Sequence, residues 1–151
     1  MCGIAGILLN KPNSVAPVFL KKMTDALAHR GPDAEGFWSN EKNTVHLGHR
    51  RLSIIDLSNN AAQPMPYAAG RYHIVHNGEI YNYAGIKKFL QNKGYSFSSR
   101  TDTEVIVAAY DYWKERCLQQ FDGMFSFVIW DEKEEQLFAA RDRFGEKPFY
   151  Y

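Results

Sequence analysis

Apolar residues follow two different spacings along the first third of the chain, and the changes between them predict strands and a helix. Residues 2–9 are a short apolar stretch punctuated by glycines, which is typical of a buried strand. Residues 18–27 have apolar positions at helical spacing, followed by a stop at Gly31 and Pro32. Residues 44–56 are predicted as one or two strands. The apolar positions that define the first helix are Val18, Leu20, Met23 and Leu27.

The middle of the chain carries one further strand signal and a second helix. A β-rich run begins at Tyr72 and ends at residues 76–79, whose sequence HNGE is a turn signal. Asn82 is placed to cap a helix that Gly94 terminates. We expect that helix to carry Ile86, Phe89 and Leu90 inward.

The last third predicts a third helix and a hairpin. Thr101 and Glu104 have the form of a capping box at the start of a helix. Residues 124–130 and 136–140 are predicted to pair as a hairpin around an acidic turn. One face of the helix presents Ile106, Ala109, Tyr110, Trp113 and Cys117.

Strands and helices do not alternate regularly in this order, which favours a layered α+β fold with largely antiparallel sheets. We expect one domain over residues 1–151. The chain stops within a strand-like run, PFYY, whereas domain boundaries are normally polar. The domain is therefore expected to be truncated at its C-terminal end.

Composition excludes several classes of function. Of 151 residues 45% are hydrophobic and 23% charged, and the net charge is +1 with scattered Lys and Arg, so neither nucleic acid nor an anionic membrane is an expected partner. No apolar run approaches the roughly 20 residues that span a bilayer, and no signal peptide is recognisable. Two cysteines make no disulfide framework. A cytoplasmic location is expected.

Two histidine pairs raise the question of a metal site. His46 and His49 are three residues apart, as are His73 and His76, and both pairs lie in predicted strands. Strand residues at that spacing point to opposite faces, so neither pair can chelate jointly. We expect no metal.

The cysteine at position 2 is the strongest candidate for chemistry. Removal of Met1 would leave Cys2 with a thiol and a free α-amine on one residue. An α-amine has an ordinary pKa of about 7.7–8.0, so near neutral pH it can act as the base for its own thiol.

Such a mechanism also needs an oxyanion stabiliser and substrate anchors. Asn77 and Gly78 offer a side-chain amide and an unhindered N–H. A tight Asn-Gly turn without chemical role is the competing interpretation, and the dipeptide alone favours it. Arg51, on a predicted strand, needs a carboxylate partner from the protein or from a ligand. Asp102 is suited to helix capping or to ligand binding, and Glu79 can face the same pocket as Asn77.

Eight ordered segments together resemble a known family. The chain is similar to the glutaminase domain of glutamine-hydrolysing asparagine synthetases, which belongs to the class II glutamine amidotransferases. The resemblance implies an N-terminal nucleophile (Ntn) hydrolase fold, with four αββα layers. The segments that carry it are MCGIAGI, HRGPD, GHRRLSIIDLS, AQPM, HNGEIYNY, RTDTEV, FDGMFSFVIWD and ARDRFGEKPFYY.

The resemblance implies a role for each candidate residue. Cys2 would be the nucleophile, and Asn77 and Gly78 the oxyanion hole. Arg51 would bind the α-carboxylate of L-glutamine, and Glu79 with Asp102 its ammonium end. The residues that would line the pocket through backbone groups are Leu52, Ile54 and Ile55.

The family also implies what lies outside this chain. A C-terminal synthetase domain would use ATP and Mg²⁺ to amidate aspartate with the ammonia, whereas this chain itself would need no cofactor. A homodimer is a further expectation. Two alternatives stay open: an amidotransferase domain that serves another acceptor, and a non-catalytic domain that binds glutamine or a partner chain.

Overall fold

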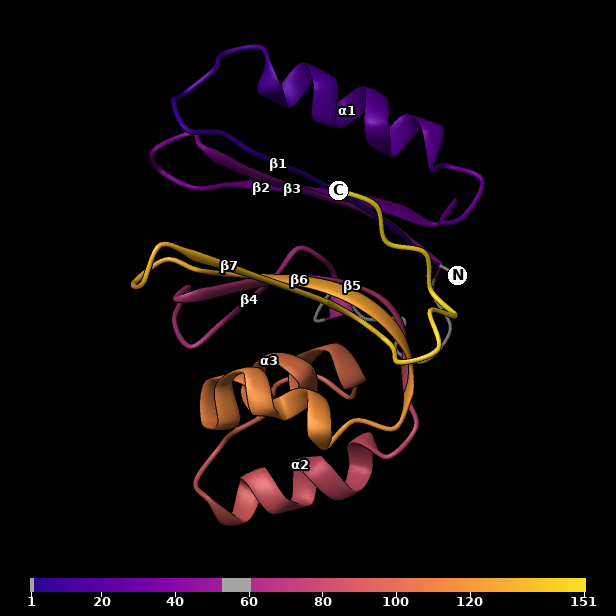
Figure 1. Cartoon of the computed structure of the whole chain (residues 1–151), viewed down its shortest axis with the longest axis vertical. Helices are drawn as coiled ribbons and strands as arrows, with labels where there is room; N and C mark the ends of the chain where they lie inside the picture. The colour runs from indigo at the N-terminus through magenta and orange to yellow at the C-terminus, as the bar shows by residue number, and fades with distance from the viewer. Residues whose placement is uncertain (1, 53–60) are drawn as a thin grey trace.

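Two antiparallel sheets lie face to face, and helices cover their outer surfaces (Figure 1). The structure is a computed structural model that describes residues 2–52 and 61–151. From one side to the other, the layers are helix α1, a three-stranded sheet, a four-stranded sheet, and helices α2 and α3 (Figure 1). The α+β fold with four αββα layers, predicted from the resemblance, is confirmed.

The three-stranded sheet brings the start of the chain beside residue 51. It consists of β1 (Gly3–Leu8), β2 (Ala34–Ser39) and β3 (Val45–Arg51), in the order β1-β3-β2. Gly3 pairs with Arg50 and Ile4 with His49. Cys2, immediately before β1, therefore lies next to the end of β3.

The four-stranded sheet has one short edge strand. Its order is β4-β5-β6-β7, and the strands are β4 (Met65–Tyr67), β5 (Tyr72–Ile80), β6 (Gly123–Asp131) and β7 (Gln136–Arg141). Strand β4 pairs only with the first part of β5, where Met65 lies opposite Ile74. Beyond that pair β5 has β6 on one side, and among the described residues no strand pairs with its other edge, which is called the open edge below.

The turn predicted at residues 76–79 is wrong, because β5 continues through them. Strand β6 pairs with β5 along its whole length, down to Gly123 opposite Ile80. At Gly78 the two backbones approach so closely that a Cβ would lie 2.1 Å from the Met124 carbonyl oxygen. The glycine in the Asn-Gly pair thus permits close strand pairing with φ of +154° rather than a reversal of the chain.

Helix α1 (Ala16–Ala26) packs against its sheet through a narrower face than the apolar pattern suggests. Its buried residues are Ala16, Leu20 and Thr24, whereas Val18 and Met23 are 57% and 41% exposed. The small residues let the helix approach Gly48 of β3, where a Cβ would lie 2.7 Å from Thr24 Cγ2. Close approach selects small side chains over bulky ones on this face.

Helix α2 (Tyr83–Asn92) buries Ile86 and Leu90, but Phe89 is 40% exposed, which contradicts the inward placement expected for it. Asn82 occupies the N-cap position without capping through its side chain. Its amide instead binds the loop before β6, donating to Gln120 O and accepting from Asp122 N–H.

Helix α3 (Asp102–Trp113) is the most buried helix of the described chain, and Thr101 caps it as predicted by accepting from Glu104 N–H. The helix ends before Cys117, which lies in the following 3-10 helix η2 (Lys114–Gln119). Cys117 is completely buried, and burial raises the pKa of its thiol to about 12. It is a small core residue rather than a nucleophile.

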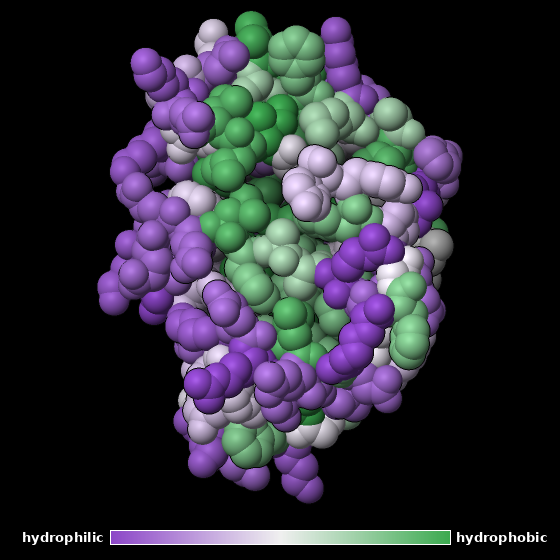
Figure 2. Space-filling model, in the orientation of Figure 1, coloured by the Kyte–Doolittle hydropathy of each residue, from purple (hydrophilic) through white to green (hydrophobic). Residues whose placement is uncertain are grey.

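The larger apolar core lies between the four-stranded sheet and helices α2 and α3, and a smaller one lies between the two sheets. On the face shown in Figure 2, apolar residues gather in a band through the middle, flanked by hydrophilic residues. Among the described helices, none is long and apolar enough to cross a membrane.

Candidate active site

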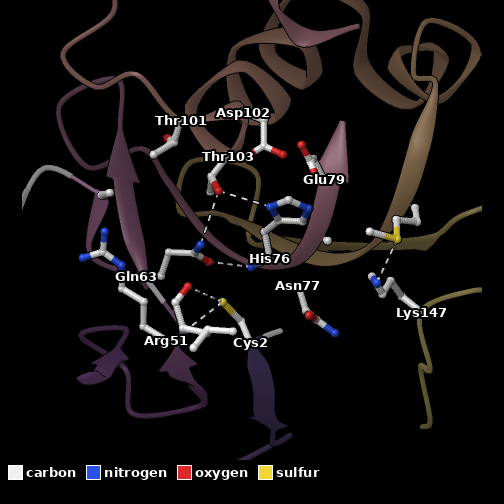
Figure 3. Close-up of a pocket in the computed structure, with 14 residues that line it drawn as sticks. Cys2, Arg51, Gln63, His76, Asn77, Glu79, Thr101, Asp102, Thr103 and Lys147 are labelled. Atoms are coloured by element: carbon white, nitrogen blue, oxygen red, sulfur yellow. Dashed lines mark hydrogen bonds between the residues drawn. The ribbon is translucent and has the colours of Figure 1, made fainter. Parts of the chain in front are cut away.

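A cavity of about 170 Å³ lies where Cys2, the end of β3, the open edge of β5 and the start of α3 meet (Figure 3). It brings together residues far apart in the sequence. Of the residues predicted for the site, those that line it are Cys2, Arg51, Leu52, Asn77, Gly78, Glu79 and Asp102. Ile54 and Ile55, also predicted, lie outside the described residues.

Cys2 is held at the cavity by contacts on both its side chain and its backbone. Its sulfur lies 3.5 Å from the Leu52 nitrogen, whose N–H donates to it. The carbonyl oxygen of Cys2 accepts from Arg30 Nε at 3.2 Å. The thiol is partly exposed, so it can meet a ligand in the cavity.

On the edge of β5 away from β6, the N–H groups of His76, Gly78 and Ile80 point to the same side. Alternate residues of a strand direct their N–H groups to the same side. On the side away from β6, His76 N–H donates to Gln63 Oε1 at 2.6 Å, and Ile80 N–H donates to Asp102 Oδ2 at 2.9 Å. Gly78 lies between them, with its N–H directed to the cavity. Backbone N–H groups placed in this way stabilise an oxyanion.

Asn77 is the second candidate donor of this group. It is 4% exposed, and its Nδ2 group is the atom that can donate to an oxyanion. Its side-chain oxygen has no partner among the described residues, and this oxygen can only accept, so a donor group of a ligand would satisfy it.

Charges of opposite sign stand on different sides of the cavity. Figure 3 shows the Arg51 side chain on one side, and Glu79 with Asp102 on the other. Helix α3 positions Asp102 in its first turn, where the helix dipole favours a carboxylate. Thr101 rather than Asp102 is the N-cap, and Asp102 binds β5 instead. This separation of charge suits a zwitterion, with its carboxylate at Arg51 and its ammonium at the acids.

Other residues line the same cavity although the sequence analysis did not assign them to the site. They are Ala61, Gln63, His76, Thr101, Thr103, Met124 and Lys147. Gln63 and Lys147 fall within segments that carry the family resemblance, AQPM and ARDRFGEKPFYY, which was the available signal. Lys147 is 2% exposed, with Nζ 3.0 Å from Met124 Sδ. It adds a buried positive charge to the cavity wall.

Histidines near the cavity are held neutral. Burial lowers the pKa of His49 to about 4; the hydrogen bond to the His76 backbone acts against this shift, and the charges of His76 and Arg51 act with it. Burial also lowers the pKa of His76, although Asp102 acts in the opposite direction. These imidazoles therefore act as neutral hydrogen-bonding groups near pH 7. Among the described residues no group of three or more His, Cys, Asp or Glu side chains is arranged to hold a metal ion.

Two solved structures share this arrangement of layers. Glutamine phosphoribosylpyrophosphate amidotransferase from Bacillus subtilis matches 94% of this chain and 37% of its own, with a TM-score of 0.76 and 20% identity. An allosteric regulatory enzyme of purine biosynthesis matches 96% of this chain and 38% of its own, with a TM-score of 0.81 and 20% identity. The fold is that of the Ntn hydrolases.

The sequence comparisons then give the family. The chain belongs to the glutamine amidotransferase domain family, whose model matches residues 1–151. It is 42% identical to asparagine synthetase [glutamine-hydrolyzing] 1 of Bacillus subtilis over 154 residues, covering all of this chain and 24% of that protein. Amidase chry2 of Gibberella zeae is 40% identical over 161 residues, again covering all of this chain and 24% of the relative. The chain thus spans about a quarter of the length of these relatives.

Proposed function

We propose that this chain hydrolyses L-glutamine to glutamate and ammonia, with Cys2 as the nucleophile. The observation that carries the proposal is that Cys2 shares one cavity with Gly78. In the same cavity Arg51 lies on one side and the carboxylates of Glu79 and Asp102 lie on the other. Arg51 holds the α-carboxylate, and Glu79 with Asp102 holds the α-ammonium group. This leaves the side-chain amide of the substrate to face the sulfur.

The reaction needs no separate base. Once Met1 is removed, the α-amine of Cys2 takes the thiol proton, and the sulfur attacks the amide carbon. Gly78 N–H and the Asn77 amide stabilise the oxyanion. The amine returns the proton to the departing nitrogen, so ammonia leaves and a γ-glutamyl thioester remains. Water then attacks the thioester, releasing glutamate and regenerating the thiol.

In the full-length protein, the ammonia would serve a synthetase domain C-terminal to this one. Support comes from the relatives, which are about four times as long and include asparagine synthetases named as glutamine-hydrolysing. We infer ATP-dependent amidation of aspartate, with ATP and Mg²⁺ bound by that domain, and a cytoplasmic location. The similarity to an amidase supports the alternative that the ammonia is transferred to an acceptor other than aspartate. The homodimer stays a prediction.

The test is an intact mass of the purified chain before and after treatment with a glutamine-analogue electrophile. We expect loss of Met1 and a single adduct that Cys2→Ala abolishes, together with glutaminase activity lost in the same variant. Processed protein without adduct or activity would contradict the proposal. A non-catalytic glutamine-binding domain would instead bind glutamine by calorimetry and release no ammonia.

A further inference from the structure

The two polar backbone atoms of His76 are both bound by side chains rather than by a neighbouring strand. His76 N–H donates to Gln63 Oε1, and His76 O accepts from His49 Nε2 at 3.2 Å. His76 immediately precedes Asn77 and Gly78, the two candidate oxyanion donors. Whatever holds His76 therefore also sets the position of these donors.

The side chain of Gln63 takes the place of a strand next to His76, because the pairing of β4 with β5 covers only Met65–Tyr67. The register of β4 with β5, continued by two residues beyond Met65, would put position 63 opposite His76. The side chain of Gln63 supplies the acceptor there. Because His76 N–H can only donate, the amide oxygen must face it, which leaves Gln63 Nε2 to donate to Thr103 Oγ1 at 3.3 Å.

The backbone of Gln63 is itself fixed against the other sheet. At Gly36 of β2, a Cβ would lie only 2.0 Å from the Gln63 carbonyl oxygen. Gln63 therefore touches β2 through its backbone, and β5 and α3 through its side chain. Three elements determine its position.

His49 binds the same residue from the nucleophile's sheet. It is 1% exposed on β3, opposite Ile4 of β1, the strand that Cys2 precedes. A carbonyl oxygen only accepts, so Nε2 carries the proton of the neutral imidazole. This hydrogen bond crosses between the two sheets and links the strand next to the nucleophile with the strand that carries the oxyanion donors (Figure 1).

We propose that Gln63 and His49 are positioning residues for the oxyanion hole, which hold His76 so that the Gly78 N–H faces the carbonyl attacked by Cys2. The inference rests on the proposed glutaminase function. The physical reason is that, within residues 2–52 and 61–151, no strand beyond β4 pairs with this edge of β5. A misplacement of about 1 Å at a reacting group costs about 100-fold in rate.

The experiment compares leucine and conservative substitutions at both positions. Gln63→Leu and His49→Leu remove the hydrogen bonds, whereas Gln63→Glu keeps an acceptor for His76 N–H and His49→Gln keeps a donor for His76 O. We expect the leucine variants to lower kcat for glutamine hydrolysis about 10- to 100-fold, with KM changed less than about threefold. The conservative variants should recover kcat to within about threefold of the wild type.

The control is Gln91→Leu, which makes the same change at an exposed position of α2. Unchanged kcat in both leucine variants, or loss of kcat without recovery in the conservative variants, would overturn the inference. If the leucine variants do not fold, Thr103→Val decides: it removes the second anchor of Gln63, and an unchanged kcat would overturn the inference. A wild type that hydrolyses no glutamine overturns the proposed function itself.

Discussion

The N–H of Leu52 donates to the sulfur of Cys2 at 3.5 Å, so the residue after Arg51 contacts the nucleophile. The side chain that would anchor the substrate carboxylate and the group that contacts the thiol thus belong to consecutive residues. Displacement of one would displace the other, and the distance between substrate anchor and nucleophile is set by a single stretch of backbone.

Replacing Arg51 should impair substrate binding more than chemistry. Only the guanidinium offers two parallel N–H donors to a carboxylate, so Arg51→Met should raise KM for glutamine about 10- to 100-fold, and Arg51→Lys by less. Steady-state kinetics measure both. Arg116→Met, at an exposed position of η2, is the matched control. An unaltered KM in Arg51→Met would remove Arg51 from the proposed binding site.

Asp102 combines two roles that substitution can separate. Asp102→Asn keeps an oxygen for the Ile80 N–H but loses the charge proposed to hold the ammonium group. We therefore expect a raised KM with little change in thermal stability. Asp102→Ala should in addition lose about 1–3 kcal/mol of unfolding free energy, because the buried N–H loses its acceptor. Equal stability of the two variants would show that the bond to Ile80 contributes nothing.

Gly78→Ala should damage both folding and catalysis. The added Cβ would collide with the Met124 carbonyl oxygen, and φ of +154° is unfavourable for alanine. We expect a loss on the order of 1–3 kcal/mol in stability and a larger loss in kcat than in glutamine affinity. Gly85→Ala is the control. It lies in α2 with no atom within 4 Å of its Cβ, so a gain of about 0.5–1 kcal/mol is expected.

Acidification should destabilise the protein between about pH 6.5 and 4. Burial lowers the pKa of His49 from 6.5 to about 4, and of His73 to about 4 as well. Between these values the unfolded chain binds more protons, so the unfolding free energy decreases as the pH falls. The loss for His49 is on the order of 3 kcal/mol when complete.

Denaturant unfolding at a series of pH values checks this prediction. His49→Gln should reduce the slope in this range, since glutamine does not titrate. The same substitution at the exposed His29 is the control. A slope unaffected by His49→Gln would show that His49 makes no contribution to acid sensitivity.

The three helices, the hairpin of β6 and β7, and the cap at Thr101 were predictable because they depend on local spacing and capping chemistry. Strands β2 and β4 were not predicted. The continuation of β5 through Asn77 and Gly78 was not predictable. An Asn-Gly pair favours a turn locally, and only the pairing with β6, about 45 residues later, overrides that preference.

That Cys2, Arg51 and Asp102 line one cavity was predictable, from the position of the cysteine and from the cost of burying the charges without a partner. The presence of Lys147 in the same cavity was not predicted. The roles of Gln63 and His49 were not predictable, since both act by completing hydrogen bonds of a distant strand. Such roles depend on where β4 ends and on how closely the sheets approach. Neither property is visible in the local sequence around these residues.

The shortness of β4 has a consequence for the chemistry. If β4 began at residue 61 instead of Met65 and kept its register, position 63 would lie opposite His76 and position 61 opposite Gly78. A carbonyl there could accept the Gly78 N–H, which is now directed to the cavity. A longer β4 would then abolish activity by occupying the Gly78 N–H, although every catalytic side chain would remain in place. In this fold, an interrupted sheet is what makes a backbone amide available to a substrate.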